Sequence, residues 1–185
     1  MTSTSTRLRE ALPWLATAAR LLLAGVFLAA GWPKFLDTEG TVRSVRAFQI
    51  LPEGLVRPFA YGLPVVELLL ALLLLVGLGA RLAAAATAVL MIVFIGGIGW
   101  AWAKGLSINC GCFGNTGTAV ADPVPGYVKD ILRDLLFLGA ASLLVVRPRS
   151  RFSVDGLLGL DPAPVAGDDP AQTDTATASK TRSPK

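Results

Sequence analysis

The run Glu67-Leu-Leu-Leu-Ala-Leu-Leu-Leu-Leu75 decides the fold, because a single acid is followed by an unbroken series of apolar residues. It lies inside a longer apolar stretch, and the chain contains other stretches of similar length. Each is long enough to cross a hydrocarbon core, which takes about 20 helical residues. Because a spanning segment must satisfy its own backbone hydrogen bonds, we predict helices rather than strands. The predicted spans are Pro13–Trp32, Phe59–Leu78, Leu82–Trp102 and Tyr127–Val146.

The composition also favours an all-α membrane protein. Of the 185 residues, 53% are hydrophobic and 16% are charged, whereas soluble domains carry about 25% charged residues. The mean hydropathy is +0.59. The net charge of +4 is spread over loops, and no basic run carries interleaved aromatic residues, so no nucleic-acid partner is expected. We therefore predict a four-helix transmembrane bundle in contact with membrane lipid.

The distribution of basic residues predicts how this bundle lies in the membrane. Short cytoplasmic flanks carry an excess of Lys and Arg. Here basic residues precede the first span, occupy the turn between the second and third, and follow the fourth. They are Arg7, Arg9, Arg81, Arg147, Arg149 and Arg151. We expect a multi-pass protein of the cell membrane with both termini cytoplasmic and the loop after the third span extracytoplasmic. The basic residues of the first loop run against this bias.

The chain divides into three sections. Residues 1–12 form a cytoplasmic N-terminal segment, residues 13–147 form the membrane domain, and residues 148–185 form a cytoplasmic tail whose composition is typical of disorder. A cleaved signal peptide is an alternative for the N-terminus, with Leu21–Gly31 as its apolar core. In the first loop, Thr38–Leu51 is predicted to form a short interfacial helix. It serves either as a simple cover for the bundle or as a lid over the cysteine loop.

Both cysteines of the chain lie in one short loop, Asn109-Cys-Gly-Cys-Phe-Gly-Asn115. A disulfide needs Cα atoms about 4.4–6.8 Å apart. Cys110 and Cys112 meet that condition only in a tight turn, for which Gly111 supplies the backbone freedom. A bond that closes so small a ring adds little stability, and strained, exposed disulfides are the labile, catalytic ones. We therefore predict that Cys110 and Cys112 exchange disulfides.

Other interpretations of the loop remain open. The bond is purely structural, or the two thiols are free and incidental. A metal site lacks donors, since the chain has no histidine and two thiolates fall short of zinc's four ligands, so no metal is predicted. In the redox interpretation Phe113 and Gly114 support the loop. Either cysteine can attack, and we expect Cys110, which precedes the turn, to be the more accessible.

Charged residues within the spans indicate partners or cavities. Arg20 lies in the first span and Glu67 in the second, so these two either pair inside the bundle, or Arg20 extends to the cytoplasmic surface. At the outer end of the fourth span, Arg133 is a candidate for holding a thiolate and Asp134 is a candidate for relaying protons. The alternative is that both belong simply to a solvent-exposed helix start. Lys34 is predicted as the other outward cation near the site.

Several stretches resemble known membrane families. The segment Arg20-Leu-Leu-Leu-Ala-Gly-Val-Phe-Leu-Ala-Ala-Gly-Trp-Pro-Lys-Phe35 resembles the opening of DoxX-type proteins, and Pro64-Val-Val-Glu-Leu68 resembles the start of their second helix. The loop Cys110-Gly-Cys-Phe-Gly114, followed by Leu132-Arg-Asp-Leu-Leu136, looks like the MauE branch, the methylamine utilisation protein family. The resemblance covers roughly residues 15 to 146, and the cysteine loop is its specific part.

This resemblance implies a four-helix membrane protein that exchanges electrons with an extracytoplasmic thioredoxin-fold partner. In the family that activity is linked to maturation of the disulfide-containing subunit of methylamine dehydrogenase. The layout is also similar to quinone-coupled disulfide-generating enzymes, which implies a quinone as cofactor, although this chain lacks their second cysteine pair. Two alternatives remain: a non-catalytic scaffold that stabilises the partner, and a small carrier that uses Arg20 and Glu67.

Overall fold

The fold is described from a computed structural model, which covers the backbone of residues 3–111 and 118–146 and the side chains of residues 14–111 and 118–146. Within these ranges the chain forms α-helices and one isolated antiparallel bridge. The helices are α1 (Ser3–Leu36), α2 (Thr38–Ala47), α3 (Glu53–Val76), α4 (Ala80–Ala103) and α5 (Val124–Val146). The predicted all-α class is confirmed. The predicted tail, 148–185, lies outside the described residues.

Two glycines reverse the chain between α3 and α4. Gly77 follows α3 with φ 74°, and its N–H donates to the carbonyl of Leu73 at 2.8 Å. Gly79 precedes α4 with φ 59°. Glycine adopts this left-handed conformation at little cost because it has no Cβ. The turn is therefore tight, and α4 runs back from the end of α3.

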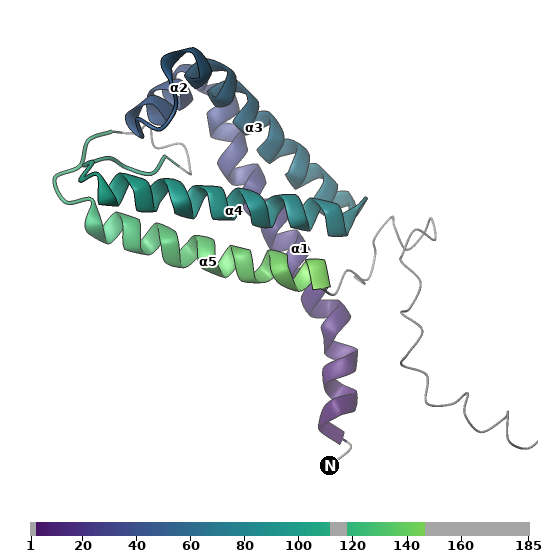
Figure 1. Cartoon of the computed structure of the whole chain (residues 1–185). Helices are drawn as coiled ribbons and strands as arrows, with labels where there is room; N and C mark the ends of the chain where they lie inside the picture. The colour runs from purple at the N-terminus through teal and green to yellow at the C-terminus, as the bar shows by residue number, and fades with distance from the viewer. Residues whose placement is uncertain (1–2, 112–117, 147–185) are drawn as a thin grey trace, which may run out of the picture.

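The four long helices form two antiparallel pairs (Figure 1). α1 packs mainly along α3, and α4 packs mainly along α5. The two pairs cross, so that α1 also contacts α5 and α3 also contacts α4. The short helix α2 packs against α3, at the end of the molecule where the chain passes from α4 to α5. The cysteine loop belongs to that end.

Apolar side chains fill the interior and also cover the outside. Fully buried side chains join the two helix pairs, and they include Leu23, Phe27, Leu74, Ala84 and Ala141. Leucines more than half exposed run along the outer faces of α3 and α5, namely Leu69, Leu72, Leu75, Leu132 and Leu136. Water disfavours so much contiguous apolar surface, whereas lipid tails accept it. The outer faces therefore fit a membrane-embedded chain.

Three helical segments are long and apolar enough to cross a membrane, among the residues that the structure describes. They are Trp14–Leu36, Glu53–Val76 and Ala80–Ala103. They correspond to the first three predicted spans, with ends that differ by a few residues. α5 coincides with the predicted fourth span but is not among the three, and its N-terminal half carries Lys129, Asp130, Arg133 and Asp134. That α5 also crosses, and that both termini are cytoplasmic, remain predictions.

The short helix predicted in the first loop is confirmed as α2. The carboxylate of Asp37 caps its N-terminus by accepting a hydrogen bond from the Gly40 N–H at 2.8 Å. Val42 is 1% exposed, on the face turned toward α3, while Arg46 points outward and pairs with Glu53. Hydrogen bonds to Glu53 raise the pKa of Arg46. α2 is thus an amphipathic helix fixed at both ends.

Gly31 sets how closely α1 approaches α3. A Cβ atom placed at Gly31 would lie 3.1 Å from the Cβ of Glu67 and 3.1 Å from the Cγ of Leu68. Such contacts are tighter than ordinary packing, so a side chain at position 31 must push the helices apart. At Gly25, earlier on the same helix, an added Cβ meets nothing within 4 Å.

We expect Gly31→Val to destabilise the protein by about 1–3 kcal/mol, because it overpacks the closest contact between α1 and α3. Gly25→Val is the matched control, since it makes the same change on the same helix at an exposed position. Thermal unfolding of both variants in detergent, followed by circular dichroism, checks this. Equal melting temperatures for the two variants would contradict the close approach.

Candidate functional site

A short pair of antiparallel segments closes the base of the cysteine loop. Ile108 and Ala119 form the isolated bridge. The Asn109 N–H donates to the carbonyl of Thr118 at 3.0 Å, and the Val120 N–H donates to the carbonyl of Ser107 at 3.0 Å. These bonds bring the chain before the cysteines and the chain after them together. Cys110 therefore leaves the base of the loop in a fixed direction.

Tyr127 fastens this loop to α5. Its hydroxyl donates to the carbonyl of Leu106 at 2.6 Å and accepts from the N–H of Ile108 at 3.4 Å. The side chain is 2% exposed. From sequence, Tyr127 was predicted only as the first residue of a span, and this role was missed. The sequence did contain a clue to it, a tyrosine at the start of an apolar helix. A tyrosine hydroxyl that is buried needs a polar partner.

Cys110 is buried rather than exposed. It has 8% exposure and packs with Ile98, Ala101 and Tyr127. The hydrogen bonds of Tyr127 hold the loop against α4 and α5, which buries Cys110. Which of the two cysteines is the more accessible stays a prediction, since Cys112 lies outside the described residues. Cys110 is disulfide-bonded, and the one other cysteine of the sequence is Cys112.

The predicted need for glycine after Cys110 is met. Gly111 has φ 72°, in the left-handed region that residues with a Cβ rarely adopt. The remaining predicted residues of the loop, Cys112, Phe113 and Gly114, lie outside the described residues. Their proposed roles stay predictions.

A partly open cavity of about 250 Å³ lies beside Cys110. Cys110 and Gly111 form part of its wall, and residues of α2 and of the ends of α1, α3 and α4 form the rest. The lining is mostly apolar, and it includes Lys34, Thr41, Phe48, Phe59, Phe94 and Gly97. α2 and the cysteine loop thus face the same space.

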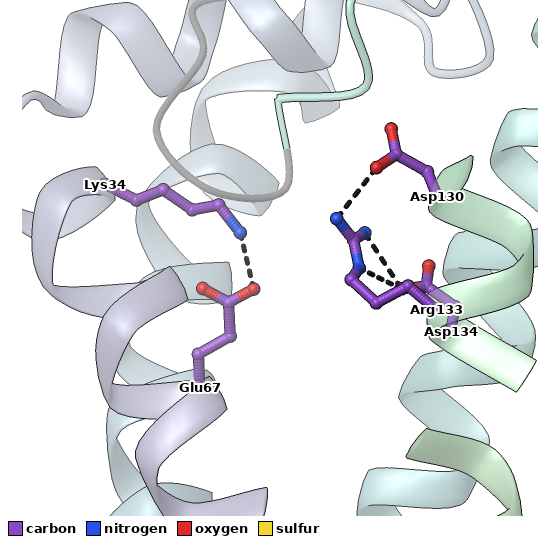
Figure 2. Close-up of polar contacts among 5 residues, drawn as sticks. All are labelled: Lys34, Glu67, Asp130, Arg133 and Asp134. Atoms are coloured by element: carbon purple, nitrogen blue, oxygen red, sulfur yellow. Dashed lines mark hydrogen bonds and ion pairs between the residues drawn. The ribbon is translucent and has the colours of Figure 1, made fainter. Parts of the chain in front are cut away.

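Lys34 and Glu67 form a buried ion pair between α1 and α3 (Figure 2). Lys34 Nζ lies 2.6 Å from Glu67 Oε1, and the two side chains are 6% and 0% exposed. Lys34 also lies over the ring of Phe94, 5.5 Å from its centroid. Lys34 was predicted as an outward cation near the site, and it lines the same cavity as Cys110; that this end of the bundle faces the outside stays a prediction. The Lys34 ammonium turns inward because the carboxylate of Glu67 compensates the cost of burying it.

The Arg20–Glu67 pair considered from the sequence is not formed. Lys34 takes one oxygen of Glu67, and the other, Oε2, accepts no hydrogen bond from the described residues. Arg20 lies 14 positions before Lys34, or about 21 Å along a straight helix, so one carboxylate does not reach both. Arg20 is 3% exposed. It is therefore buried, and the alternative of a side chain extended to the surface is wrong as well.

α5 presents a second charged group toward the first (Figure 2). Arg133 binds Asp130 at 2.7 Å and Asp134 at 2.9 Å. Asp134 is 2% exposed. Arg133 and Asp134, which were predicted with separate roles, are thus in direct contact. That they hold a thiolate or relay protons stays a prediction.

A small cavity lies between the two charged groups. It measures about 20 Å³ and is lined by Glu67, Arg133 and Asp134 among apolar neighbours. Glu67 Oε2 and Asp134 Oδ2 are both buried and accept no hydrogen bond from the described side chains. A cavity of about 10–15 Å³ is enough for one water molecule with polar partners. The geometry thus provides room for one water beside two buried carboxylates.

We expect Lys34→Met to destabilise the protein by about 3–5 kcal/mol, because it leaves the buried charge of Glu67 without its partner. The double variant Lys34→Met with Glu67→Gln removes both charges and should regain most of that loss. Thermal unfolding in detergent measures both. A single variant as stable as the unchanged protein, or a double variant no better than the single, would contradict a structural ion pair.

Comparison with known proteins places this chain in a family. No curated protein and no solved structure matches the chain. The model of one protein family, described as methylamine utilisation protein MauE, matches residues 12–147. This match covers all the described helices except the start of α1, together with the cysteine loop. The chain is therefore a member of the MauE family of membrane proteins.

Proposed function

We propose that this protein is a membrane thiol–disulfide oxidoreductase, which exchanges disulfides between Cys110 and Cys112 and an extracytoplasmic thioredoxin-fold partner. The observation that carries the proposal is the disulfide bond of Cys110 in a chain with one other cysteine two residues away. Gly111, with its positive φ, provides the turn that so small a ring requires. Membership of the MauE family and the apolar helices support an exchange at a membrane.

The exchange proceeds through a mixed disulfide. A thiolate of the partner attacks one sulfur of the Cys110–Cys112 bond, and the other sulfur leaves as a thiolate. The second thiol of the partner then attacks the mixed disulfide, which releases the partner in its oxidised form. This chain gains two electrons and, on protonation, two protons. The partner passes its new disulfide to a client protein, for which the family description points to methylamine utilisation.

The burial of Cys110 divides the roles of the two sulfurs. Cys110 is 8% exposed and packs between α4 and α5, so a protein partner has little access to its Sγ. We assign the mixed disulfide to Cys112 and the resolving step to Cys110. A buried resolving thiol is protected from wrong partners but stays next to the bond it must break. This assignment reverses the expectation from sequence order alone.

We expect Cys110→Ser to accumulate a mixed disulfide with a thioredoxin-fold probe, because Cys112 can attack and nothing resolves the product. Cys112→Ser should accumulate about tenfold less, since its remaining thiol is buried. The test mixes each reduced full-length variant, in lipid nanodiscs, with a thioredoxin whose second active-site cysteine is replaced by serine and whose remaining cysteine carries a thionitrobenzoate leaving group, and separates the adducts on a non-reducing gel. Equal yields of adduct from the two variants would contradict the assignment of attack to Cys112 and resolution to Cys110.

The double variant Cys110→Ser with Cys112→Ser serves as the control for exchange itself. It should form no adduct and leave a thioredoxin-fold partner unoxidised. If partner-dependent disulfide formation in cells continued unchanged with this double variant, the non-catalytic scaffold would be the better explanation. A membrane-impermeant maleimide, applied to reduced intact cells, locates the loop: modification of Cys112 in Cys110→Ser from outside supports an extracytoplasmic site.

A further inference from the structure

The cavity beside Cys110 has the size and the lining of a site for an aromatic ring. Its volume is about 250 Å³, and an apolar cavity of about 150 Å³ already accepts benzene. Phe48, Phe59 and Phe94 line it from three different segments of the chain. Aromatic side chains favour stacked or edge-on contacts with another ring. An apolar cavity between helices at a membrane is open to ligands that partition into lipid.

One wall of this apolar cavity carries a buried cation. Lys34 lines the cavity and is 6% exposed. An ammonium has three N–H donors, and among the described residues Lys34 Nζ hydrogen-bonds Glu67 Oε1 alone. Donors therefore remain for an acceptor inside the cavity. An acyl chain has no such acceptor, whereas a ring carbonyl does.

The cavity wall also carries the redox group. Cys110 and Gly111 line the cavity together with residues of α2, and Cys110 is 8% exposed, so a water-soluble partner has little access to its sulfur. A ligand in the cavity thus contacts the loop from the side that faces the helices. A site for a lipid-soluble two-electron carrier requires apolar walls, a buried hydrogen-bond donor and a disulfide sulfur, and this cavity has all three.

We propose that this cavity binds the ring of a membrane quinone, which oxidises the Cys110–Cys112 dithiol and accepts a hydrogen bond from Lys34 at one carbonyl. This rests on the proposed function, since it names the oxidant that restores the disulfide after each exchange. Two S–H bonds break and one S–S bond forms, which releases two electrons and two protons. The quinone takes both electrons and both protons, and its two carbonyl oxygens become the hydroxyls of the quinol.

Gly97 provides a variant that fills the cavity and Gly96 provides its matched control. Gly97 lines the cavity, and a Cβ added there would meet only Phe48, at 3.9 Å. Gly96 is exposed and does not line the cavity, and an added Cβ meets nothing within 4 Å. Gly97→Leu and Gly96→Leu therefore make the same change on neighbouring residues, and one of them occupies the proposed site.

The experiment uses full-length protein in nanodiscs and two probes, ubiquinone-1 and menadione. Binding is measured by isothermal titration, and reduction by the loss of quinone absorbance after the dithiol is generated. We expect unchanged protein and Gly96→Leu to bind and reduce at least one probe, and Gly97→Leu to lose at least tenfold in affinity. Reduction with the same affinity in Gly97→Leu would overturn the inference, as would a bound phospholipid that neither quinone displaces.

Lys34 is tested as a positioning residue through the double variant Lys34→Met with Glu67→Gln, which avoids an unpaired buried charge. Loss of a hydrogen bond from a charged donor weakens binding by about tenfold or more. We expect the KM for quinone to rise by that factor while disulfide exchange with thioredoxin persists. An unchanged KM would show that Lys34 does not hydrogen-bond the quinone.

Thioredoxin exchange, run on the same samples, separates the two proposals. Protein that exchanges with thioredoxin but neither binds nor reduces a quinone overturns the quinone site and leaves the proposed function intact. Protein that fails to exchange with thioredoxin, and whose cysteines stay unreactive, overturns the proposed function itself.

Discussion

The buried ion pair between Lys34 and Glu67 is the constraint on which the rest of the structure depends. It joins α1 to α3 in a region where apolar side chains surround both charges. Neither charge is tolerated there without the other. The pair also requires the close approach of the two helices at Gly31, since that glycine lies against the Cβ of Glu67. The close packing of α1 against α3 and the pairing of the two buried charges therefore depend on each other.

This pair also connects the two cavities. Lys34 lines the large cavity beside Cys110, and Glu67 lines the small cavity that it shares with Asp134 of α5. The two charges of the pair thus each lie at the wall of a different cavity.

The elements of the fold were predictable because long apolar segments have few alternatives in a membrane. The four long helices and α2 were all expected. α1 begins ten residues before the predicted span, at Ser3 rather than Pro13, and the other ends shift by at most six residues. Side-chain partners were not, because a helix that is apolar on all sides gives no periodicity from which to read its rotation. The sequence therefore did not reveal the pairing of Lys34 with Glu67, and Glu67 was considered instead as a partner of Arg20. The long-range bonds of Tyr127 and the cavity likewise depend on how helices meet, which hydropathy does not encode.

The glycine turn at the cysteines was predictable, since it follows from local geometry alone. The single cysteine pair has a kinetic consequence. The chain holds a single cysteine pair, with one sulfur on the wall of a cavity between the helices. Under the proposed chemistry, one redox centre serves both a partner and an oxidant, so the two half-reactions must alternate strictly. Such a protein follows ping-pong kinetics and stores no electrons between turnovers, because it has no second pair in which to hold them.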